Sequence, residues 1–399
     1  MKFRHVALAA VLTLGFATAA QAQVKGPVKI GFITDMSGVY SSLDGPGGTA
    51  AIKMAIHDFG GSVLGRKIEL VTFDHQSKAD LAAAKAKEFF SQDGVDMLIG
   101  GTNSGAMLAI EPLAAQYKKP FIVIGAGAST IVGKQCNGYT SLYAYNTTAL
   151  ARVTAGAVIK HGGRSWYFLT ADYAFGKALE VDATKVVEAD GGKVLGHVMA
   201  PLGASNFSSY MLQAQASGAD VLALANAGGD AANSIKQATQ FGVTKKMKLA
   251  GLLLFITDIH SVGLPAAQGL YLTAPWYWNL NAESRAWSKR FYAQMNAMPS
   301  FSQAGDYSAA LSYLKAVKAA GTTDGAKVMA ELHKMKVNDM FIHNGSMRPS
   351  GLMIHDMYLM QVKTPAESKE PWDYYNVVQT VPGNEAFGPA AAYGCPLDK

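Results

Sequence analysis

The stretch from 28 to 61 constrains the fold most, because it reads as a buried strand, a polar loop and a helix. Residues 28–34 are mostly apolar, as expected for a strand covered on both faces of a parallel sheet. Pro46 near the start of the helix and a glycine pair at its end set the helix limits. Ligands of such sheets bind outside the carboxyl ends of the strands. The loop 36–44 offers hydroxyl groups there but no nucleophile paired with a base, so we expect it to bind rather than catalyse.

The same strand-and-helix pattern recurs in two successive runs along the chain. Further strands are expected at residues 67–73, 96–100 and 120–124 in the first run, and at 165–170, 193–199, 220–224 and 248–253 in the second. Alternation of this kind is typical of parallel sheets covered by helices. Each run is too short to close into a barrel. The predicted fold class is therefore α/β, with two doubly wound parallel-sheet lobes.

The last third of the chain adds helices without new parallel strands. Helical patterns cover 281–295, 305–320 and 324–335, and 347–362 reads as two strands. Residues 363–399 carry five of the 14 prolines and no helical period, which predicts an extended tail on the surface. We expect a first lobe of 24–143 plus 275–344 and a second lobe of 144–274 plus 345–362. The chain would then cross between the lobes several times and form a hinge.

The N-terminus has the pattern of an export signal. Lys2 and Arg4 precede an apolar run from Val6 to about Phe16, and Ala20 to Ala22 offers a small-x-small cleavage site. A membrane anchor would need about 18–20 apolar residues, and this run is shorter. We expect cleavage after Ala22 and a periplasmic location.

Charge and motifs argue against several classes of function. The formal net charge of the chain is +6, and the sequence contains no extended Lys/Arg run. Nucleic-acid binding is therefore not expected. The segment Gly125–Thr130 imitates a dinucleotide-binding loop, but Thr130 replaces its third glycine. The histidines are scattered, and no catalytic or metal-binding motif is present in the sequence. We therefore expect neither an enzyme nor a cofactor or metal site.

The chain contains two cysteines, Cys136 and Cys395, both in polar loops that contain glycine. In an exported protein such a pair favours one disulfide. Two free thiols are the alternative. We predict the bridge, because it would tether the C-terminal segment.

Short motifs along nearly the whole chain resemble, in the same order, those of a known family. The motifs are Ile30–Phe32 with Ser37–Gly38, Asp58–Gly61, Leu64–Arg66, Asp74–Gln76, Asp172–Gly176, Asn226–Asp230 and Tyr307–Ala309. They resemble the periplasmic solute-binding proteins of ABC importers, in the branched-chain amino-acid-binding family with a type I fold. The resemblance implies two lobes that close over one small-molecule solute, like a Venus flytrap. It also implies inner-membrane permease subunits as partners, and we expect a monomer.

The resemblance places the binding residues at strand ends in both lobes. In the first lobe they are Tyr40, Asn103, Ser104, Gly125, Ala126, Gly127 and Ser129, and in the second lobe Tyr173, Phe175, Asn226, Gly228, Asp230, Leu254 and Phe255. These positions suit an anion, because backbone N–H groups and helix N-termini meet there. Ser104 opens a helix, so it could cap that helix instead of binding solute.

Two departures from the family pattern bear on the solute. Amino-acid binders of this kind hold the α-ammonium with an acidic side chain near 251–255, where this chain has no carboxylate until Asp258. A buried ammonium without a charged partner is strongly destabilised. Tyr40, Phe175 and Phe255 would instead line an aromatic slot. We predict a small aromatic or apolar carboxylate, of the benzoate or cinnamate type. Branched-chain or other amino-acid binding is the alternative, and a ligand-sensing subunit of a signalling receptor is an alternative of another class.

Overall fold

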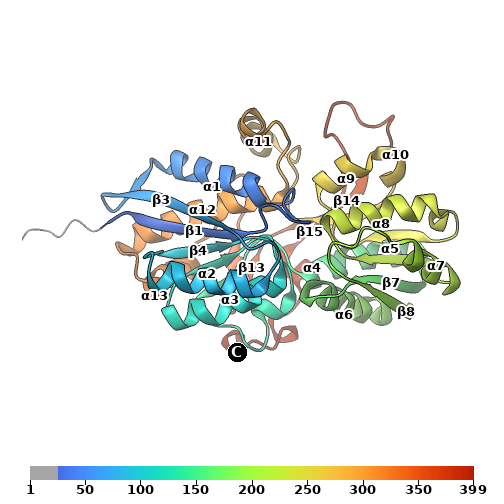
Figure 1. Ribbon diagram of the computed structural model, residues 1–399, viewed down its shortest axis with the longest axis horizontal. Coiled ribbons are helices and arrows are strands. Elements are labelled where there is room, and N and C mark those ends of the chain that lie inside the picture. The colour runs from blue at the N-terminus through green and yellow to red at the C-terminus, as the bar shows by residue number, and fades with distance from the viewer. Residues whose placement is uncertain (1–25) are drawn as a thin grey trace, which may run out of the picture.

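The computed structural model describes residues 26–399, and the predicted export signal with its cleavage after Ala22 lies outside them. The chain forms two α/β lobes that lie side by side (Figure 1). Each lobe contains one parallel-dominated sheet with helices packed on its faces, as the sequence predicted. None of the helices described is both long enough and apolar enough to cross a membrane.

The first sheet has the strand order β2-β3-β1-β4-β5-β6. All its neighbouring strands are parallel except the β2–β3 pair. Its strands are β1 (Val28–Thr34), β2 (Ser62–Val63), β3 (Arg66–Asp74), β4 (Met97–Gly100), β5 (Phe121–Val123) and β6 (Thr140–Leu142). Its helices are α1 (Gly45–Phe59), α2 (Ala79–Ser91) and α3 (Ser104–Tyr117), joined late in the chain by α11 (Ala282–Met295), α12 (Phe301–Ala320) and α13 (Gly325–Lys334). Helix α12 packs against α1.

The second sheet has the order β15-β14-β11-β10-β9-β7-β8. Strands β7 to β11 run parallel, and β14 and β15 add antiparallel at one edge. The strands are β7 (Ser165–Ala171), β8 (Lys193–Ala200), β9 (Val221–Ala225), β10 (Lys248–Gly251), β11 (Tyr271–Ala274), β14 (Met357–Val362) and β15 (Tyr375–Val381). The helices are α4 (Thr147–Leu150), α5 (Gly156–Lys160), α6 (Ala174–Ala189), α7 (Ser208–Ala216), α8 (Gly228–Gln240), α9 (Ile256–Val262), α10 (Leu264–Ala267) and, near the C-terminus, α14 (Gly383–Phe387).

The chain passes between the lobes at 143–146, 275–281 and 335–356, and it returns to the first lobe after β15, where Cys395 is bridged to Cys136. The third passage contains a short hairpin of β12 (Ser346–Met347) and β13 (Met353–Ile354). Leu142 at the end of β6 donates its N–H to the carbonyl of Gly351 in this hairpin. The hairpin therefore lies against the first sheet, although the sequence assigned it to the second lobe, and only β14 of that segment joins the second sheet.

The C-terminal segment is more ordered than the surface tail that the sequence predicted. Residues 375–381 form β15, which pairs with β14 along its whole length. Pro371 and Pro382 flank this strand without interrupting it, so the strand keeps its N–H groups for pairing. The side chains of Trp372 and Phe387 are buried. Strand β15 is therefore part of the second lobe's structure, whereas Cys395 near the end of the segment is bridged to Cys136 in the first lobe.

Local signals explain two other differences from the predicted helix and strand limits. Helix α12 begins at Phe301, four residues before the predicted start, because Ser300 and Gln303 form a capping box. Strand β10 ends at Gly251, two residues earlier than predicted, where the chain turns toward α9. The strands β2, β6, β11 and β15 and the helices α4, α5, α9, α10 and α14 were not predicted.

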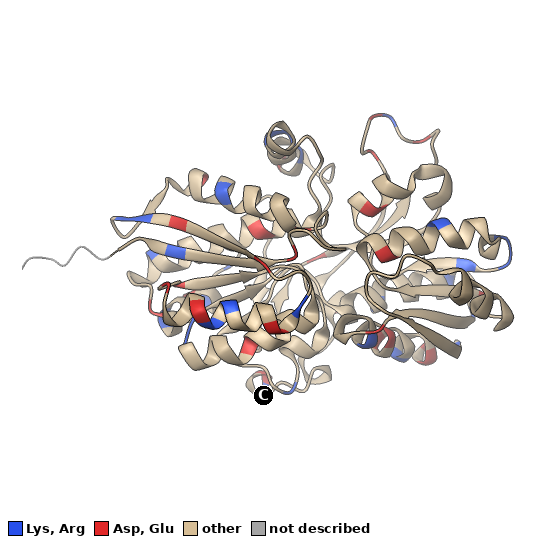
Figure 2. Cartoon of the chain, in the orientation of Figure 1, with Lys and Arg blue, Asp and Glu red and all other residues tan. Residues whose placement is uncertain are grey.

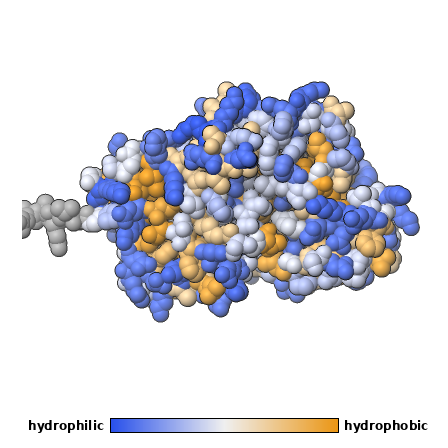
Figure 3. Space-filling model, turned by 45° about the horizontal axis from the view of Figure 1, so that its top comes forward, coloured by the Kyte–Doolittle hydropathy of each residue, from blue (hydrophilic) through white to orange (hydrophobic). Residues whose placement is uncertain are grey.

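Charged residues are distributed over both lobes (Figure 2). On the face shown in Figure 3 polar residues predominate, and the apolar areas are small and separate. The core of each lobe is built from the apolar residues of its parallel strands, such as Ile30 and Phe32 in β1 and Leu222 and Leu224 in β9.

Candidate solute-binding site

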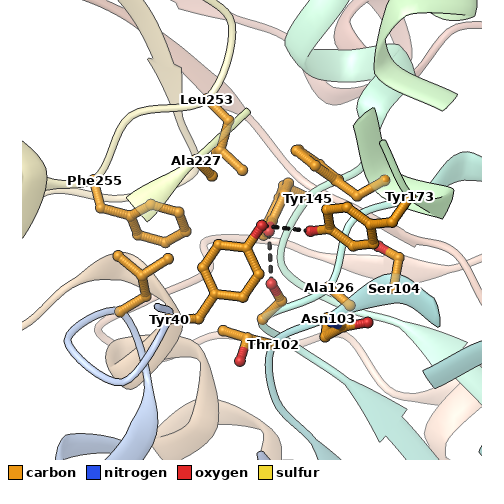
Figure 4. Close-up of a pocket in the computed structure, with 13 residues that line it drawn as sticks. Tyr40, Thr102, Asn103, Ser104, Ala126, Tyr145, Tyr173, Ala227, Leu253 and Phe255 are labelled. Carbon is orange, nitrogen blue, oxygen red and sulfur yellow. Dashed lines mark hydrogen bonds between the residues drawn. The ribbon is translucent and has the colours of Figure 1, made fainter. Parts of the chain in front are cut away.

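A small cavity lies between the two lobes, at the carboxyl ends of strands from both sheets (Figure 4). It is lined by Tyr40, Leu43, Thr102, Asn103, Ser104, Gly125, Ala126, Tyr145, Tyr173, Phe175, Ala227, Leu253 and Phe255. This is the place where ligands of open parallel sheets bind. Because both lobes contribute to the wall, opening the lobes would expose the cavity.

The loop after β1 positions Tyr40 in the first-lobe wall. Asp35 accepts the N–H groups of Gly38 at 2.7 Å and Tyr40 at 3.3 Å, and the hydroxyl of Ser77 at 2.8 Å. These bonds hold the loop in one conformation. The Tyr40 ring is thereby directed across the cavity and is 2% exposed.

The start of α3 supplies two polar residues whose roles differ. Asn103 is the helix cap, since its Oδ1 accepts the N–H of Ala106 at 3.1 Å. Ser104 instead accepts the N–H of Ala128 with its Oγ at 3.2 Å. The capping role considered for Ser104 therefore belongs to Asn103, and Ser104 keeps its hydroxyl hydrogen available beside the cavity.

In the second-lobe wall, Asp258 ties two cavity loops together. Its carboxylate accepts the N–H of Phe255 at 2.9 Å and also the N–H of Gly228. Burial raises the pKa of Asp258 to about 7. Asp258 does not line the cavity, so this carboxyl group does not supply an acidic partner to a solute.

Aromatic groups from both lobes meet across the cavity. The hydroxyl groups of Tyr40 and Tyr173 lie 2.6 Å apart and point toward one another (Figure 4). Burial raises the pKa of both phenols, so both stay neutral at ordinary pH. Phe255 stacks on Phe301 with ring centroids 4.2 Å apart, and Tyr145 donates its hydroxyl to the Gly125 carbonyl at 2.8 Å. The cavity is therefore a largely aromatic slot.

The charge around the cavity comes from the backbone rather than from side chains. Among the described residues, no Asp, Glu, Lys, Arg or His lines the cavity. Helices α3, α6 and α8 each begin at its wall: Ser104 is the first residue of α3, and Tyr173 and Ala227 directly precede α6 and α8. Helix N-termini carry partial positive charge and unpaired N–H groups. The site therefore favours an anion over a cation.

A pair of buried carboxyl groups lies behind the first-lobe wall. Asp44 accepts the Thr34 hydroxyl at 2.9 Å, and Gly48 leaves room for Asp44 and Asp306 side by side. Both carboxyl groups are fully buried and have no basic partner within the described residues. Burial raises the pKa of both groups, which disfavours two negative charges side by side.

Eight of the predicted binding residues line the cavity, namely Tyr40, Asn103, Ser104, Gly125, Ala126, Tyr173, Phe175 and Phe255. The others, Gly127, Ser129, Asn226, Gly228, Asp230 and Leu254, do not line it.

Each of the six has another contact. A Cβ on Gly127 would meet the ring of Tyr145 at 2.3 Å, and the Leu254 side chain is buried against Gly251. The Ser129 hydroxyl donates to Asp182 at 2.8 Å, the Asn226 amide donates to Ser234 at 3.0 Å, and Asp230 accepts the N–H of Gly203 at 3.0 Å. Gly228 adopts φ +61° and faces Tyr40 with its backbone.

Five lining residues were missed by sequence reasoning: Leu43, Thr102, Tyr145, Ala227 and Leu253. Tyr145 follows β6, a strand that was not predicted. Thr102 directly precedes the predicted Asn103, and Ala227 lies inside the predicted stretch Asn226–Asp230.

Two sheet-based lobes with a cavity at the strand ends between them define a bilobal solute-binding protein. The chain belongs to the periplasmic binding protein family, whose model matches residues 27–369. A crystal structure of a periplasmic binding protein from Burkholderia mallei is 58% identical, with a TM-score of 0.92, and the match covers 94% of this chain and 99% of that one. A branched-chain amino-acid ABC transporter periplasmic ligand-binding protein from Burkholderia xenovorans is 41% identical, with a TM-score of 0.83, covering 93% of this chain and all of that one.

More distant comparisons agree with the fold. A Leu/Ile/Val-binding protein homologue from Brucella abortus is 29% identical over 219 residues. That match covers 54% of both chains, so this chain spans about half the length of the curated relatives it matches. A solute-binding protein of an ABC transporter from R. palustris, in complex with benzoate, is 22% identical, with a TM-score of 0.83 over 93% of this chain and all of that one.

Proposed function

We propose that this protein is the periplasmic binding component of an ABC importer for a small aromatic carboxylate. The observation that carries the proposal is the composition of the cavity wall. Five aromatic rings line it, no charged side chain among the described residues does, and three helices begin there. Rings suit an aromatic body, and helix N-termini suit a carboxylate.

The absence of a charged partner argues against an α-amino acid as the solute. Asp258, the first carboxylate after β10, is occupied by the N–H groups of Phe255 and Gly228. Asp230 accepts the N–H of Gly203 and does not line the cavity. An ammonium group in this cavity would be desolvated without an ion-pair partner, at a cost of several kcal/mol.

Other parts of the proposal rest on family membership. Export through the predicted N-terminal signal, a monomeric state and delivery of the solute to inner-membrane permease subunits are proposed on that basis. The benzoate complex from R. palustris supports the compatibility of this fold with an aromatic acid. At 22% identity, the comparison supports only this compatibility of the fold. The name of the 41% identical Burkholderia xenovorans protein favours branched-chain amino-acid binding as the second candidate.

A thermal-shift panel on the purified protein tests the solute class. The panel contains benzoate, cinnamate, the uncharged analogue benzamide, leucine and isoleucine. A ligand at about 100 times its Kd stabilises a protein by roughly 2.7 kcal/mol. We expect this stabilisation from an aromatic acid and a much smaller one from benzamide, which lacks the anion. A large shift with leucine or isoleucine and none with the acids would contradict the proposal and favour the second candidate.

A further inference from the structure

Ser129, which the sequence placed in the binding cavity, makes a contact between the lobes instead. It is the first residue of the 3-10 helix η1 (Ser129–Val132), which packs against α3 and β6 of the first lobe. Its hydroxyl donates to Oδ2 of Asp182 at 2.8 Å. Asp182 lies on α6, which packs on the second sheet, so this hydrogen bond joins the two lobes.

The same carboxylate oxygen accepts two hydroxyl groups from its own lobe. Thr147 and Thr148, at the start of α4, donate to Oδ2 of Asp182 at 2.7 Å and 3.1 Å. Thr147 Oγ1 in turn accepts the N–H of Ser129 at 3.0 Å. The other oxygen of Asp182 is 3.4 Å from the Nζ of Lys185. Asp182 is 8% exposed, so these donors satisfy a largely buried carboxylate. Two of the donors, Thr147 and Thr148, directly follow the first passage between the lobes.

This cluster is connected to the cavity wall by the loop 125–129. Gly125 and Ala126 line the cavity, and the N–H of Ala128 donates to the cavity residue Ser104 at 3.2 Å. The carbonyl of Gly127 accepts the N–H of Thr147 at 2.7 Å. One end of the loop is therefore part of the cavity wall, while the other end is attached to the second lobe.

We propose that Asp182 is a positioning residue for solute binding, because its hydrogen bond to Ser129 stabilises the closed arrangement of the lobes. The bond joins groups from different lobes, so it is made when the lobes are closed. It also sets where Gly125 and Ala126 lie in the closed cavity. The inference rests on the proposed solute-binding function but not on the identity of the solute.

The test compares three variants in the full-length protein. Ser129→Ala removes only the hydroxyl that joins the lobes, and Ser129→Thr retains a hydroxyl at that position. Thr148→Val is the matched control, since it removes a hydroxyl that reaches the same carboxylate from within the second lobe. Spin labels on cysteines introduced at exposed Lys87 in α2 and exposed Gln213 in α7 report the distance between the lobes.

We expect Ser129→Ala to shift the label distances of the protein without added solute toward larger values. Its benzoate affinity should fall about tenfold, which corresponds to about 1.4 kcal/mol. Ser129→Thr should restore both measurements, and Thr148→Val should match the wild type in both. The unfolding temperature without solute should be nearly the same for Ser129→Ala and Thr148→Val.

Unchanged label distances in Ser129→Ala, or equal changes in Thr148→Val, would overturn the inference. A lower unfolding temperature of Ser129→Ala with unchanged distances would also overturn it, because that result describes a purely structural role. If benzoate binds no variant and not the wild type, the proposed solute class fails, and the distances without solute still decide the role of Asp182.

Discussion

The phenolic oxygens of Tyr40 and Tyr173 lie 2.6 Å apart, although the two residues belong to different lobes. Tyr40 follows β1 of the first sheet, and Tyr173 follows β7 of the second. Each is placed by its own strand end, so their distance reports how far the lobes have closed. The backbone of Gly228 in the second lobe also approaches the Tyr40 ring.

The hydrogen bond between these phenols should couple the effects of removing them. We expect Tyr40→Phe and Tyr173→Phe to be non-additive in the free energy of unfolding without solute, with a coupling of about 0.5–1.5 kcal/mol. Urea denaturation of both single variants and the double variant measures this coupling. The pair Tyr40→Phe and Tyr393→Phe is the control, because Tyr393 bonds elsewhere, to Asn146 and Phe387. Additivity in the Tyr40–Tyr173 cycle would show that the contact is not formed in solution.

A side chain at Gly228 should prevent the lobes from closing. Gly228 has φ +61°, and a Cβ there would lie 2.9 Å from the Tyr40 ring and 3.0 Å from the Val39 carbonyl. We expect Gly228→Ala to lower the affinity for the acid that binds best in the thermal-shift panel by at least about tenfold, measured by calorimetry.

Gly218→Ala is the control for the backbone conformation alone. Gly218 has a similar φ of +68°, but nothing lies within 4 Å of its Cβ position. Both substitutions should cost about 1–2 kcal/mol of stability, because both place alanine in the left-handed region. Only Gly228→Ala should lose affinity. An equal loss in both variants would mean that the strain, rather than the contact with Tyr40, is responsible.

The predicted disulfide is present between Cys136 and Cys395, with Cα atoms 5.7 Å apart. It ties the C-terminal segment to the first lobe across a sequence separation of 259 residues. Replacing both cysteines by serine should lower the free energy of unfolding by on the order of 3–4 kcal/mol, since a long loop in the unfolded chain is released. Urea denaturation measures this loss, and reduced wild-type protein should match the double variant. Equal midpoints for oxidised and reduced protein would contradict the expectation.

Glu111 in α3 should make the stability fall as the pH rises. Burial raises its pKa from the ordinary 4.5 to about 7, and the Asn137 amide donates a hydrogen bond to its Oε1 at 3.3 Å. The folded state therefore binds the proton more tightly than the unfolded state does. The resulting stabilisation is complete below about pH 4.5 and is lost as the pH rises to about 7.

Glu111→Gln replaces the titratable carboxyl group by an amide of nearly the same shape, so the side chain no longer binds or releases a proton. We expect it to match the wild type in stability near pH 4.5 and to exceed it above pH 7 by on the order of 2–3 kcal/mol. Urea denaturation across this pH range is the measurement. Glu188→Gln, at an exposed position in α6, should change little at any pH. Parallel pH profiles for wild type and Glu111→Gln would show that Glu111 titrates normally.

Much of the fold could be predicted from the sequence, because the strands of parallel sheets are short apolar runs between amphipathic helices. Strands such as β1, β4 and β7 carry this pattern strongly, and their predicted limits agree closely with the structure. The strand β15 could not be recognised in this way, since it is a half-exposed edge strand between two prolines. The position of β15 in the sheet follows from its pairing with β14, and the residues of β15 alone do not indicate this pairing.

For the candidate site, too, the sequence determined some features and the tertiary structure decided others. The sequence by itself determined which loops follow the parallel strands, and hence that Tyr40, Ser104, Gly125 and Phe255 would lie near one another. Only the tertiary structure decided the direction of each side chain within those loops. Ser129 turns toward Asp182 because a buried carboxylate from the other lobe needs hydrogen-bond donors, and Tyr145 faces the cavity because β6 pairs with β5. Both outcomes depend on contacts between segments far apart in the chain, and local sequence patterns contain no information about such contacts.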